Sequence, residues 1–412
     1  MSEPLVVIGN GMAAARLADE LSTRALGRYA VAIVGEEPRL AYNRVLLSSV
    51  LAGEVASCDI ELKPTQWWLD RGITLRYGCR ATAIDTARRT VALADGQSLS
   101  FSKLVLATGS QPIRPAIPGM TLPGVITFRE IGDIWTMWHR AGTDDRVVVI
   151  GGGLLGLEAA YGLAKAGARV TVLHLMDRLM ERQLDPHAAR MLQRALERKG
   201  IEVLLNADTA EIVGHDRVEA VALKDGRTID TDAVVVAIGI RPNAELARAA
   251  GIAIKRGILV DDALETNVAG IFAIGECAEH RDICYGLVEP AYEQARVLAD
   301  HLIGRSARYG GSVLATNLKV SGVNVFSAGN FLGGDGTEEI VLSDPGLGIY
   351  KKLVIAEDEL VGAVLFGDTA DGLWYLDLIR SRQSIAPMRD ELAFGRALAQ
   401  RAAAPAPARL AA

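Results

Sequence analysis

An internal repeat constrains the fold of this 412-residue chain more than any other feature. The apolar run Leu5–Ile8 ends in Gly9-Asn10-Gly11, and a helix-like stretch follows at once. The same order returns when Val147–Ile150 leads into Gly151-Gly152-Gly153 and a second helix-like stretch. Continuous apolar runs without alternation are typical of parallel strands that are covered on both faces. The repeat therefore predicts an α/β fold with two related Rossmann-like, three-layer nucleotide-binding domains.

The repeat continues beyond the glycine loops, and it sets the expected domain boundaries. Each copy adds a second apolar run, an Asp-Gly turn and a closing apolar strand: Val31–Val34, Asp95-Gly96 and Leu104–Gly109, then Val170–Leu173, Asp225-Gly226 and Val234–Gly239. The length suits two or three domains of about 100–200 residues each. We expect a first nucleotide-binding domain from 1–113 with 240–311, a second from 114–239, a C-terminal α+β domain from 312–400 and a flexible tail from 401–412.

Composition excludes several function classes. The net charge of −6 and the pI of about 5.7 argue against nucleic acid as a partner. The N-terminus lacks the pattern of a signal peptide, and no apolar stretch reaches the ~18 residues that span a bilayer, so we expect a cytoplasmic protein with no membrane partner. The four cysteines, Cys58, Cys79, Cys277 and Cys284, form no CxxC pair, and we expect no metal site.

The C-terminal region has the texture of an antiparallel sheet followed by a helix. We expect strands at Asn317–Val325, Glu339–Leu342, Tyr350–Ile355 and Val361–Leu365, and a helix from Trp374 to about Ser381. Two clusters of basic residues, Lys351-Lys352 and Arg380 with Arg382, either meet an acidic redox protein or are simply solvated. Trp374 and Tyr375 either approach a cofactor or pack in the core.

The first glycine loop has the pattern that binds a pyrophosphate. Gly9, Gly11 and Ala14 stand in the order Gly-x-Gly-x-x-Ala directly after a predicted strand. Glycine allows the backbone to approach the phosphates, and the N-terminus of the next helix favours negative charge. Glu36, at the end of the second strand, is placed to accept hydrogen bonds from an adenosine ribose.

The second loop is complete, but it leaves the nicotinamide nucleotide undecided. Gly151, Gly153 and Gly156 form Gly-x-Gly-x-x-Gly, and His174 stands where an acid usually selects NAD. His174 either hydrogen-bonds a ribose hydroxyl or merely caps the strand. Arg178 is close enough in sequence to accommodate a 2′-phosphate. NADH is expected, and NADPH stays open.

The ordered set of motifs resembles the FAD-dependent pyridine-nucleotide-disulfide oxidoreductase superfamily. The similarity covers roughly residues 5–395 and rests on the glycine loops, the Ala-Thr-Gly and Ala-Ile-Gly strand ends, and the run from Thr266 to Ala278. It implies that Glu276 binds the ribityl chain of FAD. It also implies that the helix near Pro290 directs its N-terminus to the O2 side of the flavin.

The resemblance and the two loops together give a set of residues expected to bind FAD and NADH. For FAD it is Gly9, Gly11, Met12, Ala13, Ala14, Glu36, Glu37, Arg44, Ala83, Ala107, Thr108, Gly109, Gly275, Glu276, Pro290 and Ala291. For the nicotinamide nucleotide it is Gly151, Gly153, Leu154, Leu155, Gly156, Glu158, His174, Ala237, Ile238 and Gly239.

The cysteine positions indicate a branch of the superfamily that lacks a redox-active thiol. The CxxxxC of glutathione-reductase-like members is absent, and so is the single cysteine that other branches carry before Arg44; Cys58 lies outside that motif. The run from Tyr42 to Glu54 is similar to the FAD/NADH portion of assimilatory nitrate and nitrite reductases. Four later segments share this similarity: Leu179–Asp185, Gly275–His280, Gly286–Val288 and Gly367–Asp371.

This resemblance implies an enzyme that passes electrons from NADH through flavin to a redox protein. The expected partner is the nitrate reductase catalytic subunit, or a small iron–sulfur carrier if the chain is a ferredoxin or rubredoxin reductase. A non-catalytic protein that senses FAD and NADH is the alternative from another class. Within the enzyme, Glu158 is expected to orient the nicotinamide and Arg44 to pair with FAD; as structural groups they would be a helix-terminal acid and a surface cation. A homodimer is left open.

Overall fold

The computed structural model describes residues 2–140, 142, 144–320 and 322–403, which fall into two compact units. The first unit combines the chain up to residue 114 with residues 129–136 and 239–312. The second combines residues 115–128 and 137–238 with the chain from 313 onward. Helix α4 (Ile131–Arg140) contains residues of both units.

The first unit is built on a parallel five-stranded sheet in the order β19-β7-β1-β2-β3. Its strands are β1 (Glu3–Ile8), β2 (Tyr29–Gly35), β3 (Thr74–Tyr77), β7 (Lys103–Leu106) and β19 (Ile271–Ala273). The remaining elements of this unit are α1 (Met12–Arg24), η1 (Arg44–Leu46), α2 (Leu47–Leu51), α3 (Thr65–Asp70), β4 (Ala81–Asp85), β5 (Thr90–Leu93), β6 (Ser98–Ser100), β8 (Ser110–Pro112), β17 (Ile240–Pro242), α7 (Glu245–Ala249), β18 (Ile258–Val260), η2 (Gly275–Cys277), β20 (Ala278–His280), β21 (Ile283–Cys284) and α8 (Val288–Leu302).

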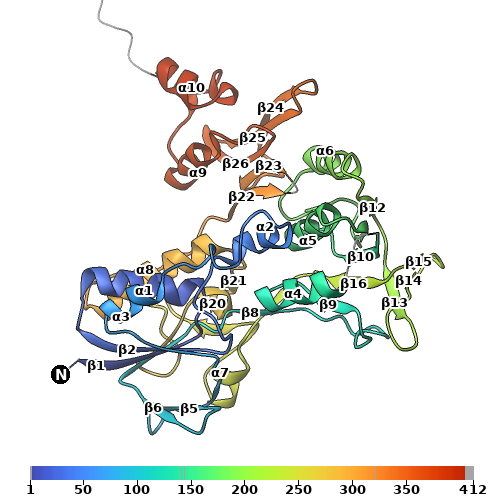
Figure 1. Ribbon diagram of the computed structural model, residues 1–412. Helices are drawn as coiled ribbons and strands as arrows, with labels where there is room; N and C mark the ends of the chain where they lie inside the picture. The colour runs from blue at the N-terminus through green and yellow to red at the C-terminus, as the bar shows by residue number, and fades with distance from the viewer. Residues whose placement is uncertain (1, 141, 143, 321, 404–412) are drawn as a thin grey trace, which may run out of the picture. The chain divides into compact units, whose positions relative to one another are not determined.

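Both faces of this sheet are covered, as the continuous apolar strands predict. Leu5 and Val7 of β1 pack under α1 and α8, which lie side by side on one face (Figure 1). Val6 and Ile8 point to the other face, where the small antiparallel sheet β4-β5-β6 covers them. Because alternate residues of β1 enter opposite layers, every residue from Leu5 to Ile8 is buried.

The second unit repeats this plan in a sheet of order β12-β11-β10-β16-β9, again parallel throughout. Its strands are β9 (Val125–Thr127), β10 (Arg146–Ile150), β11 (Arg169–Leu173), β12 (Glu202–Leu204) and β16 (Ala233–Val236), accompanied by α5 (Leu154–Lys165), α6 (Pro186–Glu197), β13 (Thr209–Val213), β14 (Ala220–Leu223) and β15 (Thr228–Asp230). In both sheets the strand before the glycine loop occupies the centre. The predicted pair of Rossmann-like layers is confirmed.

Helix α6 begins as its sequence predicts. Asp185 is the N-cap residue, its side chain accepts a hydrogen bond from the Ala188 N–H at 3.0 Å, and Pro186 takes the first helical position. The other carboxylate oxygen of Asp185 accepts from the Tyr350 hydroxyl at 2.6 Å. One buried carboxylate thus connects the start of α6 with the C-terminal sheet of the same unit.

That C-terminal sheet is antiparallel, in the order β22-β23-β26-β25-β24. It consists of β22 (Ala315–Val320), β23 (Val323–Gly329), β24 (Glu338–Asp344), β25 (Ile349–Ala356) and β26 (Glu359–Phe366), followed by α9 (Gly372–Ser381), η3 (Ala386–Met388), η4 (Leu392–Phe394) and α10 (Arg396–Ala403). The α+β character of this region is therefore as predicted. The domain boundaries inferred from the repeat remain a prediction.

Three expectations about the C-terminal region were wrong. The single strand 317–325 is two strands of a hairpin, because Gly322 at φ +77° reverses the chain and Val320 pairs with Val323. Residues 401–403, expected in a flexible tail, are instead helical, since α10 extends to Ala403 through an alanine-rich, helix-forming run; residues 404–412 lie outside the described residues.

The third correction concerns Lys351 and Lys352, which neither meet solvent nor offer a partner surface. They are only 5% and 6% exposed, because β25 is covered on both faces. Lys351 pairs with Asp368 at 2.8 Å and Lys352 with Glu339 at 2.6 Å. The core alternative for Trp374 and Tyr375 is confirmed, since both are buried in the cluster between α9 and the sheet.

In the part of the chain that the structure describes, no helix combines the length and apolar character needed to cross a bilayer.

Candidate functional site

The first glycine loop approaches a neighbouring strand too closely for a side chain. The Gly9 N–H donates to the Val34 carbonyl at 2.7 Å, and Gly9 has φ +114°. A methyl group at Gly9 would lie 2.0 Å from the carbonyl oxygen of Ala107, at the end of β7. The loop therefore needs glycine here for its own geometry, whether or not a ligand is bound.

Gly11 has a different environment, because a methyl group there would meet no atom within 4 Å. Gly11 is the N-cap of α1; no side chain caps this helix, and its first turn contains no acid. The first helical bond runs from the Ala15 N–H to the Gly11 carbonyl, so the N–H groups of Met12, Ala13 and Ala14 have no partner within the helix and can face a ligand. Open space in front of an uncapped helix N-terminus suits the pyrophosphate of a dinucleotide.

The two carboxylates that follow β2 have separate environments. Glu36 is exposed. Glu37 accepts a hydrogen bond from the Tyr42 hydroxyl at 2.7 Å and forms an ion pair with Arg44. Burial is the main cause that raises the pKa of Tyr42, so its hydroxyl stays a donor at neutral pH. Glu36 is the freer acid for a ribose, and Glu37 holds Arg44.

A second group of polar residues gathers around Glu276 in η2. Its Oε2 accepts from the Ser110 hydroxyl at 2.8 Å and pairs with Arg129. The Arg129 carbonyl in turn accepts from Arg44 at 2.9 Å, which links the two groups. The sequence predicted Arg44 and Glu276 but missed Arg129, which no motif marks, and Ser110, whose only signal is its place directly after Gly109.

The ends of β7 and β19 and the start of α8 bring the remaining predicted FAD residues to the same unit. Thr108 donates to the Asn243 carbonyl at 2.6 Å, and Gly109 has φ +65°. The Gly275 N–H donates to the fully buried side chain of Gln294 at 2.7 Å. Pro290 and Ala291 are buried in the first turn of α8. Ala83 lies apart from these residues along the chain, exposed in β4 of the small antiparallel sheet.

The second glycine loop reproduces this geometry in the second unit. The Gly151 N–H donates to Leu173 at 2.8 Å, and a methyl group at Gly151 would lie 2.3 Å from the Ala237 carbonyl oxygen. Gly153 is the uncapped N-cap of α5, in open space, and the helix begins with Leu154 and Leu155. A methyl group at Gly156 would lie 1.9 Å from the Gly151 carbonyl oxygen.

His174 lies directly beneath this loop and bonds to protein through both ring nitrogens. Its Nδ1 accepts from the Gly152 N–H at 3.0 Å, and its Nε2 lies 3.1 Å from Oε2 of Glu181. His174 is 8% exposed. The structure thus assigns it a role in supporting the loop, and a direct bond to ribose stays a prediction.

The other residues predicted to bind the nicotinamide nucleotide lie in α5 and directly after β16. Glu158 is in the second turn of α5 and is 8% exposed. Ala237 and Ile238 follow β16, and Ile238 is 40% exposed. Gly239, with φ +123°, begins the return of the chain to the first unit.

The four cysteines are free thiols in different environments. Cys277 is fully buried, and burial raises the pKa of its thiol. Burial also raises the pKa of Cys284 to about 11, so its thiol is protonated at neutral pH. Cys58 is exposed and Cys79 half-buried. Within residues 2–140, 142, 144–320 and 322–403, no three His, Cys, Asp or Glu side chains gather where they could hold a metal ion.

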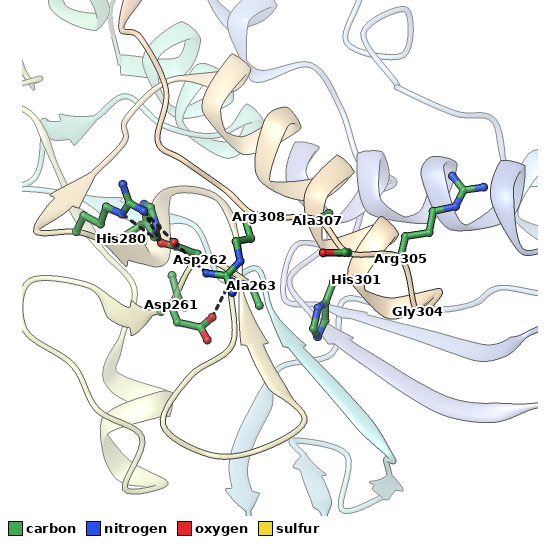
Figure 2. A pocket seen from close by; sticks show the side chains of 12 residues that line it. Asp261, Asp262, Ala263, His280, His301, Gly304, Arg305, Ala307 and Arg308 are labelled. Carbon is green, nitrogen blue, oxygen red and sulfur yellow. Dashed lines mark hydrogen bonds and ion pairs between the residues drawn. The ribbon is translucent and has the colours of Figure 1, made fainter.

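A cavity of about 660 Å³ lies elsewhere in the first unit, between the end of β18, β20 and the C-terminus of α8 (Figure 2). Asp262 in its wall accepts from His280 at 2.9 Å and from Arg281 at 2.8 Å, and these bonds lower the pKa of Asp262. None of the residues predicted to bind a cofactor lines this cavity. The dinucleotide sites are defined by the glycine loops instead.

Comparison with known proteins gives a consistent result. Residues 3–297 match the family described as pyridine nucleotide-disulphide oxidoreductase, and residues 315–383 match the rubredoxin NAD+ reductase C-terminal domain. The chain is 46% identical over 383 residues to the nitrite reductase [NAD(P)H] of Bacillus subtilis, covering 93% of this chain and 48% of that protein. It is 42% identical over 389 residues to the assimilatory nitrate reductase electron transfer subunit of the same organism, covering 94% and 50%.

Among solved structures, the ferredoxin reductase for the CYP199A2 system from Rhodopseudomonas palustris superposes with a TM-score of 0.88 at 27% identity. The superposition covers 98% of this chain and all of that one. The chain spans about half the length of the nitrite and nitrate reductase proteins that it matches.

Proposed function

Because the chain belongs to the pyridine nucleotide-disulphide oxidoreductase family, we propose that it is an FAD-dependent reductase that takes a hydride from NAD(P)H and passes electrons to a redox protein. The family uses FAD and NAD(P)H. The observation that carries the proposal is the pair of glycine loops. Each loop leads into a helix whose N-terminus has no side-chain cap, and the space in front of its N-cap residue, Gly11 or Gly153, is open.

We propose that the first loop holds the pyrophosphate of FAD, with Glu36 at the ribose, and that Glu276 and the start of α8 hold the ribityl chain and the ring. Bound FAD would supply the change from two-electron to one-electron chemistry. Arg129 and Ser110 support this assignment, because they fix the carboxylate of Glu276. Arg44, held by Glu37, is proposed as the cation beside the cofactor.

The second loop is proposed to hold the pyrophosphate of NAD(P)H. Glu158, near the start of α5, is proposed to orient the nicotinamide ring. Hydride transfer depends on proximity and orientation rather than on a protein acid or base. The environment of the cysteines supports direct exit of electrons from the flavin, without a thiol relay.

For the electron acceptor we propose the catalytic subunit of an assimilatory nitrate reductase. The support is the 42% identity to the electron transfer subunit of that system over 94% of this chain. A rubredoxin or ferredoxin reductase is the second candidate, favoured by the match of residues 315–383 to the rubredoxin NAD+ reductase C-terminal domain. The cytoplasmic location, the homodimer and a sensing role without turnover remain predictions from the sequence.

Anaerobic stopped-flow mixing of the FAD-loaded chain with NADH, and separately with NADPH, tests the reductase half of the proposal. Bleaching of the flavin absorbance on a catalytic timescale is expected. Reoxidation of the reduced protein is then followed with the nitrate reductase catalytic subunit, with rubredoxin and with ferredoxin. Fast reoxidation by the first supports the nitrate assignment, and fast reoxidation only by a small carrier replaces it. A chain that binds no FAD, or is bleached by neither nucleotide, contradicts the reductase function.

A further inference from the structure

Strands β2 and β11 occupy equivalent positions in their sheets, but an acidic residue follows directly only after β2. In the first unit, Gly35 ends β2 and Glu36 follows it. In the second, His174 takes the place of Gly35, and the next residue is the exposed Leu175. A carboxylate that reads an adenosine ribose is therefore missing from the strand end itself.

The structure supplies a carboxylate at this place from the following loop. Nδ1 of His174 accepts the Gly152 N–H, so the proton of a neutral ring lies on Nε2 and is donated to Glu181. The side chain of Glu181 is 23% exposed, whereas that of His174 is 10% exposed. The imidazole thus connects the glycine loop to a partly accessible acid seven residues further along the chain.

The loop that carries Glu181 has a fixed conformation. Met180 is fully buried and has φ +49°, a conformation that costs a residue with a side chain about 1 kcal/mol or more. Its N–H donates to the Gly152 carbonyl at 3.0 Å. Leu179 and Leu184, at 1% and 0% exposed, anchor the loop on both sides. Met180 therefore bonds to the carbonyl of Gly152, and His174 bonds to its N–H. Glu181 comes directly after Met180, and its side chain is partly accessible to solvent.

The basic residues of this loop are each beside an acid. Nη1 of Arg178 lies 3.1 Å from Asp177, and Nε of Arg182 lies 3.7 Å from Oε1 of Glu181. Arg182 is 86% exposed and free to swing away. Glu181, in contrast, is bound to a buried group and cannot leave without breaking the His174 bond.

We propose that Glu181, positioned by His174, is the carboxylate that accepts the adenosine ribose hydroxyls and makes the enzyme select NADH over NADPH. In NADPH a 2′-phosphate replaces one of these hydroxyls, and it would lie close to the Glu181 carboxylate and be repelled. The inference rests on the proposed function of the second loop. It names NADH as the hydride donor, a choice that His174 alone does not decide.

The test compares NAD⁺ and NADP⁺ binding by calorimetry, and reduction by NADH and NADPH, in the FAD-loaded full chain. Glu181→Gln is expected to weaken NAD⁺ binding about tenfold, the loss of one hydrogen bond to a charged group, and to leave or improve the binding of NADP⁺. Glu181→Asp keeps the charge and is expected to retain a preference for NADH. Asp177→Asn is the matched control, because it removes an acid of the same loop that is 67% exposed and bonds only to Arg178 in the described contacts.

Each result distinguishes the inference from the proposed function. The inference is overturned if the unmodified protein prefers NADPH, or if Glu181→Gln leaves the preference unchanged or shifts it no more than Asp177→Asn does. In those cases flavin reduction by either nucleotide still upholds the reductase function. If neither nucleotide binds or bleaches the flavin, it is the proposed function that fails.

Discussion

The two glycine loops share a backbone plan but divide its side chains differently. In the first unit Asn10 is the middle residue of the loop and Gly35 is the last residue of β2; in the second, Gly152 is the middle residue and His174 directly follows β11. A methyl group at Gly35 would lie 2.5 Å from Cβ of Asn10, and one at Gly152 would lie 2.6 Å from Cγ of His174. The space between loop and strand therefore holds one side chain. It belongs to the loop residue Asn10 in the first unit and to His174, directly after the strand, in the second.

The loops differ again at their third position, which is Ala14 in the first and Gly156 in the second. Ala14 is fully buried, so the first helix accepts a methyl group here. At Gly156 the same group would lie 1.9 Å from the Gly151 carbonyl oxygen. Glycines of one motif thus have separate reasons: close approach within the protein at Gly151 and Gly156, and open space for a ligand at Gly153.

The largest effect is expected at the third position. Gly156→Ala should lower the free energy of unfolding by about 3 kcal/mol, because the clash is with backbone that cannot rotate away. Ala14→Gly, the reciprocal change, should cost about 1.5 kcal/mol through lost burial and helix propensity. Urea unfolding of both variants measures the difference. Equal costs would show that the two helices approach their loops alike, contrary to the structure.

A smaller effect, on binding rather than stability, is expected at the second glycine. Gly153→Ala should raise the Kd for NAD⁺ by about 10- to 100-fold, because the methyl group would enter the space proposed for the pyrophosphate. Its φ of −83° and the open surroundings suit alanine, so stability should fall by less than about 1 kcal/mol.

Gly11→Ala is the matched variant in the first unit, with φ −106° and open space. It should lose FAD on gel filtration while its NAD⁺ affinity is retained, and Gly153→Ala should do the reverse. If each variant loses both nucleotides, or neither, the assignment of one dinucleotide to each loop is wrong. Absorbance of retained flavin and calorimetry with NAD⁺ supply the two readouts.

Most of the elements compared here could be predicted from the sequence, because the residues that indicate each element lie close together along the chain. The strands before and after both glycine loops follow from short runs with a clear pattern, whereas the helix near Pro290 was implied only by the family resemblance. The contacts of Arg129 with Glu276 and of Ser110 with Glu276 join residues 147 and 166 positions apart, and no local pattern marks them. His174 was identified from its position, but its bond to Glu181 depends on the path of a loop held by Met180 at positive φ.

The failures in the C-terminal region have a related cause. Tyr350–Ile355 was recognised as a strand, yet lysines at its centre were read as surface charges because the cover on both faces comes from distant elements. The hairpin at Gly322 was not predicted because only two residues separate Val320 from Val323, so the two short apolar runs resemble one strand. The local sequence pattern shows that a strand exists. Whether its residues are buried, and which strand it pairs with, depends on elements that are distant in the sequence.

Exchanging the side chains between loop and strand sharpens the comparison further. Gly152→Asn alone should destabilise the second unit by contact with His174 and with the buried Leu179, and His174→Gly alone by loss of its two hydrogen bonds. Combined, they recreate the arrangement of Asn10 and Gly35. We expect the double variant to be about 1 kcal/mol more stable than the sum of the single effects, measured as a double-mutant cycle in urea. Strict additivity would mean that the two positions do not share one space.

The smallest effect concerns thiol reactivity, which should be confined to the first unit because all four cysteines belong to it. At pH 8, iodoacetamide should modify the exposed Cys58 first. The pKa of Cys284, raised to about 11, leaves about one thousandth of that thiol ionised at pH 8, and each unit of increasing pH up to about 10 should speed its reaction about tenfold. Mass spectrometry of peptides from the native protein follows each site. Cys58→Ser should leave flavin reduction and reoxidation unchanged, since electrons are proposed to leave the flavin directly; a marked loss of turnover in this variant, with FAD retained, would instead place a thiol on the path.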